Sequence, residues 1–438
     1  MRELTKAAAS FSYAASLFGI REGVGLLASR EAQHSLYSVR QAMTGQLSDL
    51  VWAAFQVGDH MQREAVDWAF NLMTLRAFMP ASLAQMASAA TWQATETARM
   101  LMPGANVRLA WQQLRNNYEV FNLVKHVRAL LHVPEGPEFP LEHLVENAYA
   151  LGEYPDLWAV EGLGHDYADR FWGPLENIRN LLTDEKARAL PAQSLTMMHA
   201  GMGLSFAQHL LHTVSPFSLE AEIARMLESF ITLCRENSQA GYVGAAYESL
   251  GLVTRTWNAE LIPVIDRSLS QIDEEIAAHF WHGVGRALYF LPIYFVPGLL
   301  SPWRTLDHDA PSEAARCNLR AGLAWATTLV NLRQPAIMEG LIARHGSLLQ
   351  ENDAFANGVA SSTIMAWDIT PGDSYIQSFV RHEPAPDLAD QWDRLVRRPC
   401  RLALERYHSV LQRAGRLGEV FRYQNLDELV NTLEGRRK

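Results

Sequence analysis

Cysteine is scarce in this sequence. The 438 residues include three cysteines, Cys234, Cys317 and Cys400, which are odd in number and lie far apart in the chain. Such a set forms neither a disulfide framework nor the paired cysteines of a structural zinc site. We therefore expect a reducing compartment, with the cytoplasm as the default location.

An excess of basic charge is also absent. The formal net charge is −10 at pH 7, whereas a general nucleic-acid binder needs a basic face that displaces the counterions of the phosphates. Nucleic acid is therefore not an expected partner. The hydrophobic content of 48% and the charged content of 20% are those of an ordinary globular protein rather than a disordered one.

Long hydrophobic runs are lacking as well. The most apolar stretch, residues 287–300, has 14 residues and contains Pro292 and Pro297. A membrane-spanning helix needs about 20 apolar residues. The weakly apolar residues 7–20 carry serine and tyrosine, which favours an amphipathic helix over a signal peptide. We expect no membrane span.

Signals for strands and nucleotide-binding loops are missing. The first third shows no apolar–polar alternation bounded by Asn-Gly or Asp-Gly, and the chain contains no Gly-x-x-x-x-Gly-Lys-Ser/Thr motif. Apolar residues instead recur with the 3.6-residue period of helices, for example over residues 35–57 and 106–131. The sequence therefore predicts an all-α protein.

Prolines divide the chain into three predicted parts. Residues 132–140 carry three prolines and a glycine, and residues 381–386 carry two further prolines, which helices do not tolerate. We predict an N-terminal helical bundle over residues 1–133, a body over residues 134–380 and a helical tail over residues 381–438. The tail is rich in arginine, and we interpret it as a solvated helix against the acidic body and as a candidate homo-oligomer contact.

Small residues recur within the predicted body. The steps are Glu161-Gly-Leu-Gly164, Ala200-Gly-Met-Gly203, Glu248-Ser-Leu-Gly251, His282-Gly-Val-Gly285, Ala321-Gly-Leu-Ala324 and Asn357-Gly-Val-Ala360. Aligned on their second residue, they are 39, 48, 34, 39 and 36 residues apart. This spacing is typical of helix-pair repeats, so we predict a solenoid-like or toroid-like body. Glycine within a helix indicates close approach of neighbouring backbones or room for a bound molecule.

Polar residues precede several of these steps, and they are the candidates for acid/base chemistry. If the repeats curl into a ring or a tight arc, the polar residues before the steps converge on one concave surface with Arg286 and His199 nearby; they are Glu161, Glu248, His282 and Asn357. A buried glutamate and histidine that share a site have shifted proton affinities suited to general acid/base catalysis. The alternative is that each of these residues caps a helix or satisfies a neighbouring backbone group.

Aromatic residues follow the central step. Trp281, Tyr289 and Phe290 are candidates to line an apolar slot for a ligand. The polar anchors of this slot would be His282, Arg286, Glu161 and Glu248, and His199 is a further candidate for ligand binding. Aromatic residues at helical spacing are also typical of a hydrophobic core. Histidine pairs at helical spacing, such as His209 with His212, admit a metal site, but Glu-x-x-His and His-x-x-His are frequent by chance in a helical protein. We assign no metal ligand, and no cofactor is identified.

One resemblance adds to these patterns. The stretch His282-Gly-Val-Gly-Arg-Ala-Leu-Tyr-Phe290, with the steps at Ala200 and Asn357, resembles an uncharacterised bacterial helical family that is encoded beside enediyne polyketide clusters. The resemblance covers roughly residues 155–370 and implies helical repeats and a part in lipid-like or polyene metabolism. Ala200 stands where that family often has glutamate, so an acidic site shared with the family at this step is not expected.

Three functions remain open from the sequence. The first is a biosynthetic accessory protein or enzyme that holds a long apolar, polyene-like molecule in an aromatic-lined cavity, with Glu161, Glu248 and His282 as the acid/base residues. The second is a non-catalytic helical scaffold that binds a protein partner on a concave face. The third is a metal-dependent oxygenase.

Overall fold

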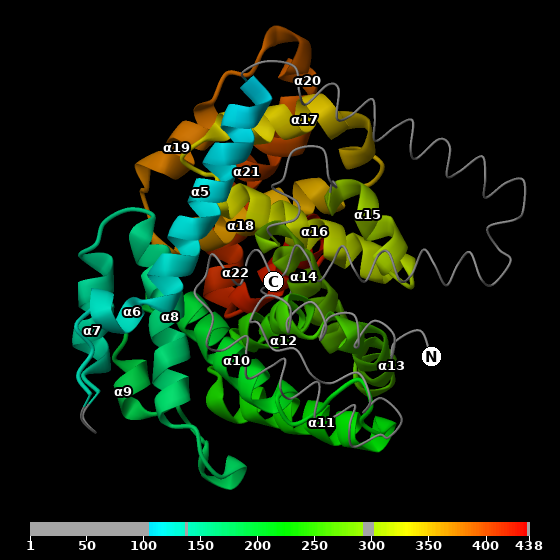
Figure 1. Cartoon of the computed structure of the whole chain (residues 1–438). Coiled ribbons are helices and arrows are strands. Elements are labelled where there is room, and N and C mark those ends of the chain that lie inside the picture. The colour runs from blue at the N-terminus through cyan, green and yellow to red at the C-terminus, as the bar shows by residue number, and fades with distance from the viewer. Residues whose placement is uncertain (1–104, 136–138, 292–301, 436–438) are drawn as a thin grey trace, which may run out of the picture. The chain divides into compact units, whose positions relative to one another are not determined.

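The computed structural model describes residues 105–135, 139–291 and 302–435. These residues form helices and no strand (Figure 1), so the predicted all-α class is confirmed. The helices predicted before residue 105 and the proline-containing half of the apolar run 287–300 lie outside the described residues. None of the described helices is both long enough and apolar enough to cross a bilayer.

The helices have the following bounds. Those of the first half are α5 (Ala105–Lys125), α6 (Val127–Leu130), α7 (Leu141–Tyr149), α8 (Pro155–Arg170), α9 (Glu185–Arg188), α10 (Leu195–Leu211), α11 (Glu220–Asn237), α12 (Val243–Trp257) and α13 (Ile262–Ile272). Those of the second half are α14 (Glu274–Phe290), α15 (Pro302–Asp309), α16 (Glu313–Val330), α17 (Pro335–Leu349), α18 (Ala354–Ile369), α19 (Ser374–Arg381), α20 (Ala389–Trp392), α21 (Arg398–Leu402), α22 (His408–Ala414), η9 (Leu417–Phe421) and α23 (Leu426–Gly435).

The chain divides into two compact units. One comprises Met1–Ala110, Ser215–Ser218 and Leu291–Leu300, most of which lies outside the described residues. The other comprises Trp111–Val214, Leu219–Phe290 and Ser301–Lys438. The second unit contains the predicted small-residue steps, and the site described below lies within it. The boundaries predicted from the prolines stay predictions.

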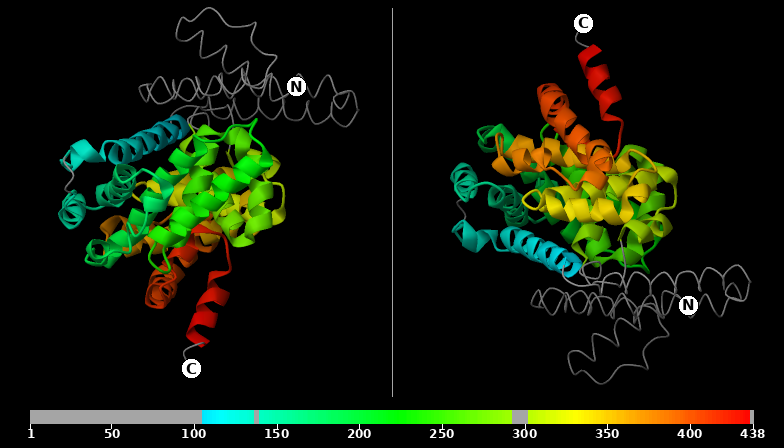
Figure 2. Two further views of the ribbon diagram at one scale, coloured as in Figure 1. Left: turned by 90° about the horizontal axis from the view of Figure 1, so that it is seen from below. Right: turned by 90° about the horizontal axis from the view of Figure 1, so that it is seen from above.

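A row of long helices forms the core of the second unit. Helices α8, α10, α12, α14, α16 and α18 pack side by side in chain order, each against the next (Figures 1 and 2). Helices α11 and α13 pack against each other and flank the row at α10, α12 and α14. The sequences of the row are apolar or small around most of the helix, as expected of helices buried on several sides; α10 and α18 are buried over nearly their whole length.

The predicted small residues lie at the contacts between neighbouring helices of the row. A Cβ added to Gly283 on α14 would lie 2.0 Å from the carbonyl oxygen of Glu248 on α12. Ser249 stands at the same place in the step on α12, and its hydroxyl donates to the carbonyl oxygen of Ala200 on α10 at 2.9 Å. Three further glycines meet a backbone oxygen of the preceding helix of the row in the same way: Gly201 (Glu161), Gly322 (His282) and Gly358 (Ala321). Gly162 meets the carbonyl oxygen of Val124 on α5.

The fourth residue of a step approaches the following helix instead. A Cβ on Gly251 would lie 1.9 Å from the carbonyl oxygen of Phe280, and a Cβ on Gly285 would lie 2.0 Å from that of Leu319. The small residues therefore permit close backbone approach, which was one of the two interpretations of the steps. The packing register is the same from contact to contact, while a helix-pair repeat of solenoid or toroid form stays a prediction.

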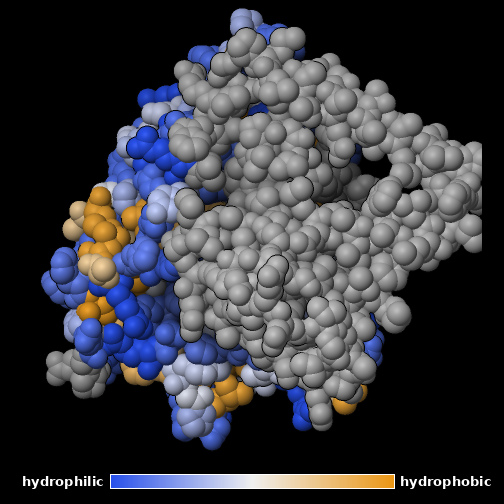
Figure 3. All heavy atoms as spheres, viewed as in Figure 1, coloured by the Kyte–Doolittle hydropathy of each residue, from blue (hydrophilic) through white to orange (hydrophobic). Residues whose placement is uncertain are grey.

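The predicted basic tail packs on the end of this row. The chain from α20 to α22 contacts α18 and contains two π-helical segments, Asp393–Arg397 and Ala403–Tyr407. Several tail arginines are paired: Arg397 with Glu383, and Arg406 with Asp427 and Glu434. The described surface on the face of Figure 3 is mostly hydrophilic, with hydrophobic residues gathered on the side where α6 and α7 lie.

Candidate functional site

Arg286 joins three helices of the row at one buried point. Its Nη2 atom donates to Oε1 of Glu161 on α8 at 2.5 Å, and its Nη1 atom donates to Oε2 of Glu248 on α12 at 2.9 Å. The side chains of Arg286, Glu161 and Glu248 are 2%, 2% and 0% exposed. A guanidinium group shared by two carboxylates is fully charged, and both ion pairs are shielded from water.

His282 completes the cluster. It lies one turn before Arg286 on α14, and its Nδ1 atom is 2.9 Å from Oε1 of Glu248. Its side chain is 1% exposed. An ionised carboxylate only accepts hydrogen bonds, so Nδ1 carries the proton and donates it to Glu248. In the neutral imidazole, Nε2 then carries the free lone pair.

Opposing effects set the proton affinities of the cluster. Burial by itself raises the pKa of Glu248, but the charge of Arg286 and the hydrogen bond from His282 outweigh burial and hold that pKa below its usual value. Burial acts to lower the pKa of Arg286, yet the two carboxylates raise it.

The packing register explains how these side chains meet. Each of the three residues Glu161, Glu248 and His282 directly precedes the small residue that touches a helix earlier in the chain. They therefore occupy the same position on their helices, and the short distance between backbones lets Arg286, one turn later, reach both carboxylates. The sequence predicted this convergence from the recurrence of polar residues before the steps.

Several buried polar atoms of the central helices have no hydrogen-bond partner among the described residues. They include Nε2 of His282, Nε of Arg286, Nε1 of Trp325 and Oγ of Ser361. Trp325 lies directly against the cluster: the guanidinium carbon of Arg286 is 4.8 Å from its ring centroid, and the His282 ring meets it edge-on at 6.2 Å. Buried polar groups are normally satisfied by protein, water or a ligand.

His199 is separate from the cluster. Its Nδ1 atom donates to the carbonyl oxygen of Leu195 at 2.6 Å, and its Nε2 atom accepts from the backbone N–H of Gln239 at 3.0 Å. Its ring stacks on Tyr242 at 5.2 Å. Complete burial lowers the pKa of His199 to about 4. The neutral ring is satisfied at both nitrogens and links the start of α10 to the start of α12.

The predicted aromatic residues point to places other than the cluster. Nε1 of Trp281 donates to Oδ1 of Asp266 on α13 at 2.6 Å. The hydroxyl of Tyr289 accepts from Nδ2 of Asn331 at 2.5 Å, and Phe290 packs edge-on against Tyr289 at 5.6 Å. Trp281 therefore faces the flanking helix, while Tyr289 and Phe290 lie at the end of α14. Trp325, by contrast, contacts the cluster.

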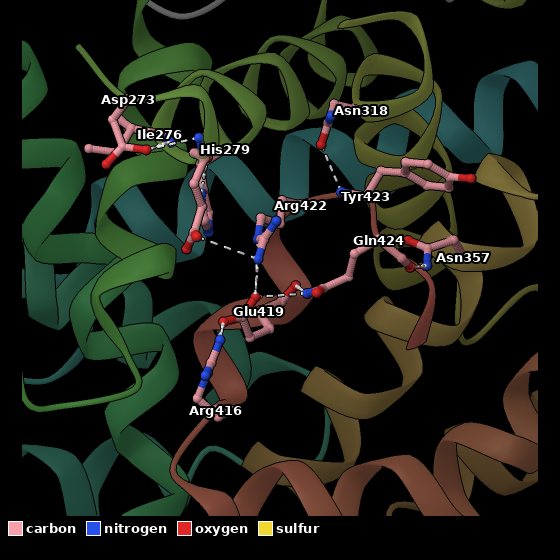
Figure 4. A network of polar contacts seen from close by, with 11 residues as sticks. Asp273, Ile276, His279, Asn318, Asn357, Arg416, Glu419, Arg422, Tyr423 and Gln424 are labelled. Carbon is pink, nitrogen blue, oxygen red and sulfur yellow. Dashed lines mark hydrogen bonds and ion pairs between the residues drawn. The ribbon is translucent and has the colours of Figure 1, made fainter. Parts of the chain in front are cut away.

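Asn357, which the sequence predicted to converge with Glu161, Glu248 and His282, joins a different polar network. Its Nδ2 atom donates to the carbonyl oxygen of Gln424 at 2.6 Å, in the segment of residues 417–424, which we name the C-terminal clamp (Figure 4). At the centre of the clamp, the buried carboxylate of Glu419 accepts from Arg416, Arg422 and Gln424. Sequence reasoning treated this part of the chain as a solvated tail and missed its buried anchor; an acidic residue between two arginines was the signal.

Metal-binding geometry is not assembled in the described part of the chain. No three histidine, cysteine, aspartate or glutamate side chains converge there as a set of ligands. In the pairs considered from the sequence, His209 bonds to Asp169 at 2.7 Å, and His279 donates from Nδ1 to the carbonyl oxygen of Glu275 at 2.8 Å. Each histidine is thus held by a separate protein partner.

Comparison with known proteins adds no family to this geometry. No protein-family model matches the chain. No significant match to the chain was found among curated proteins or among solved structures.

Proposed function

We propose that the protein binds a small, largely apolar molecule at the buried centre of the second unit, and that Glu248 and His282 act on it as a general acid/base pair. The observation that carries this proposal is the Nε2 atom of His282. This atom is fully buried and has no partner among the described residues; when the imidazole is neutral and Nδ1 donates to Glu248, Nε2 carries the lone pair. An orphaned buried acceptor next to an orienting carboxylate is the arrangement of a general base.

The other members of the cluster have supporting roles. Glu248 orients the imidazole and stabilises it when Nε2 takes a proton from the ligand. Arg286 keeps Glu248 ionised and is itself fixed by Glu161. The proton then returns from Nε2 to the ligand, so the residues end the cycle unchanged. No redox partner is needed for this proton transfer.

The surroundings favour an apolar ligand with one polar end. Trp325 covers one side of the cluster, and the unpartnered donors, Nε1 of Trp325 and Nε of Arg286, suit an oxygen acceptor on the ligand. The resemblance to the enediyne-associated family is consistent with a polyene-like molecule and a biosynthetic role. An aromatic slot lined by Trp281, Tyr289 and Phe290 is not part of this proposal, because their contacts lie elsewhere.

Native mass spectrometry of the full-length protein, with metal analysis of the same sample, tests the proposal. We expect a co-purifying small molecule whose occupancy falls in His282→Gln and Arg286→Ala. His408→Gln is the matched control, because His408 is another buried histidine paired with a carboxylate, Asp368, at 3.0 Å. A protein retained in place of a small mass would support the scaffold function instead. Equal losses in His282→Gln and His408→Gln would contradict the proposed site.

A further inference from the structure

The C-terminal clamp lies across the N-terminal ends of four central helices. The N–H of Gly418 donates to the carbonyl oxygen of Gly241, just before α12, at 2.6 Å. Nη2 of Arg422 lies 3.7 Å from Oε2 of Glu275, which is in the first turn of α14. The N–H of Tyr423 donates to Oδ1 of Asn318 on α16 at 2.7 Å, and its hydroxyl donates to Oδ1 of Asp353 at the start of α18. The clamp therefore ties together helices that are far apart in the chain.

Glu419 is the anchor of the clamp. Its carboxylate accepts from Nε and Nη2 of Arg422 at 3.0 and 2.8 Å and from Nε2 of Gln424 at 2.9 Å, and it also pairs with Arg416 (Figure 4). Burial raises the pKa of this carboxyl, but Arg422 and Arg416 outweigh burial and hold the pKa below its usual value. A charged carboxylate with this many donors fixes the backbone on either side of it.

Phe421 extends from this anchored segment to the candidate site. Its side chain is fully buried, and its ring centroid is 5.8 Å from that of Trp325. The ring centroid of Trp325 in turn lies 4.8 Å from the guanidinium carbon of Arg286 and 6.2 Å from the ring centroid of His282. A continuous line of contacts therefore leads from the clamp through two aromatic rings to the acid/base cluster.

We infer that the C-terminal clamp is part of the candidate site and that Phe421 is a positioning residue, which holds Trp325 against Arg286 and His282. Protein interiors are densely packed, so loss of the Phe421 ring lets Trp325 relax away from the cluster. Glu419 acts one step further out, because it keeps the segment that carries Phe421 in place. The functional meaning of this inference rests on the proposed function, whereas the geometry can be tested without a ligand.

The test compares two buried phenylalanines that pack on tryptophan. Phe379 is also fully buried, and its ring centroid is 5.9 Å from that of Trp392, so Phe379→Leu is the matched control for Phe421→Leu. The readouts are the indole N–H resonance of Trp325 and the Cε1–H resonance of His282 in full-length labelled protein. Phe421→Leu should shift both resonances, and Phe379→Leu should leave them in place.

A second variant keeps the inference testable if Phe421→Leu does not fold. Glu419→Gln removes the anchor and leaves both aromatic rings, and it should move the same two resonances in the same direction. Its control is Glu434→Gln, which removes a half-exposed ion pair with Arg406 in the same tail. Equal effects of Phe421→Leu and Phe379→Leu, or resonances that neither Phe421→Leu nor Glu419→Gln moves, would overturn the inference. A protein without a bound molecule would contradict the proposed function and leave these shifts unaffected.

Discussion

Glu161 and Arg286 are 125 residues apart in the chain, yet they form a buried ion pair of 2.5 Å. Because the same guanidinium also bonds to Glu248, helices α8, α12 and α14 share one electrostatic centre. Charges removed from water in this way depend on one another, so each has to be considered together with its partners.

Replacement of Arg286 by methionine should strongly destabilise the protein. The variant keeps a similar volume but leaves Glu161 and Glu248 as buried carboxylates without a cation. Breaking a buried pair from one side typically costs about 3–5 kcal/mol in the free energy of unfolding. Urea denaturation of the full chain measures this cost. Arg406→Met is the control, because Arg406 binds Asp427 and Glu434 at the surface, and it should change the midpoint little. Similar costs for the two variants would contradict the assigned role of Arg286.

The stability supplied by Glu248 should depend on pH in one direction. Its pKa lies below the value of 4.5 that it has in the unfolded chain, so its contribution is complete above pH 4.5 and is lost as the pH falls through the lower folded-state pKa. Glu248→Gln keeps an oxygen that accepts from Nδ1 of His282. The difference in the free energy of unfolding between wild type and Glu248→Gln should therefore shrink as the pH falls below 4.5. A difference that grows toward low pH would rule this out.

Much of the cluster could be predicted from the sequence, and the reason is the packing register. Glycine or serine at the second place of a step lets two backbones touch, so the residue before it must face the same way on each helix. Glu161, Glu248 and His282 follow from that rule. Trp325 and Phe421 do not follow from it, because their meeting depends on how the C-terminal clamp crosses the helix ends, and no periodic pattern encodes that path. The sequence placed Trp281 in a ligand slot, but its indole N–H donates to Asp266 on α13, and this bond holds the ring away from the cluster.

Alanine in place of a step glycine should disrupt the helix row. In Gly283→Ala the new Cβ would lie 2.0 Å from the carbonyl oxygen of Glu248, a backbone atom that cannot move without displacing α12. Overpacking of this kind costs about 1–3 kcal/mol or more, although alanine favours helices by about 1 kcal/mol over glycine. Thermal and urea unfolding should both show the loss. Gly173→Ala is the control, because no atom lies within 4 Å of its added Cβ; a loss of the same size there would mean that close approach is not the cause.

Asp156 should destabilise the protein as the pH rises. It lies in the first turn of α8, and burial raises its pKa from 3.8 to about 7. The folded protein therefore holds a proton that the unfolded chain releases, so stability relative to a neutral side chain falls between pH 4 and 7, by at most about 1.4 kcal/mol per pH unit. Asp156→Asn keeps an oxygen that accepts from the N–H of Leu157, as Asp156 does at 2.6 Å. We expect Asp156→Asn to match wild type near pH 3.5 and to exceed it at pH 8 in the free energy of unfolding, while the exposed Asp387→Asn shows no such trend. An advantage of Asp156→Asn that is the same at both pH values would show that the substitution acts through packing and not through the titration of the carboxyl group.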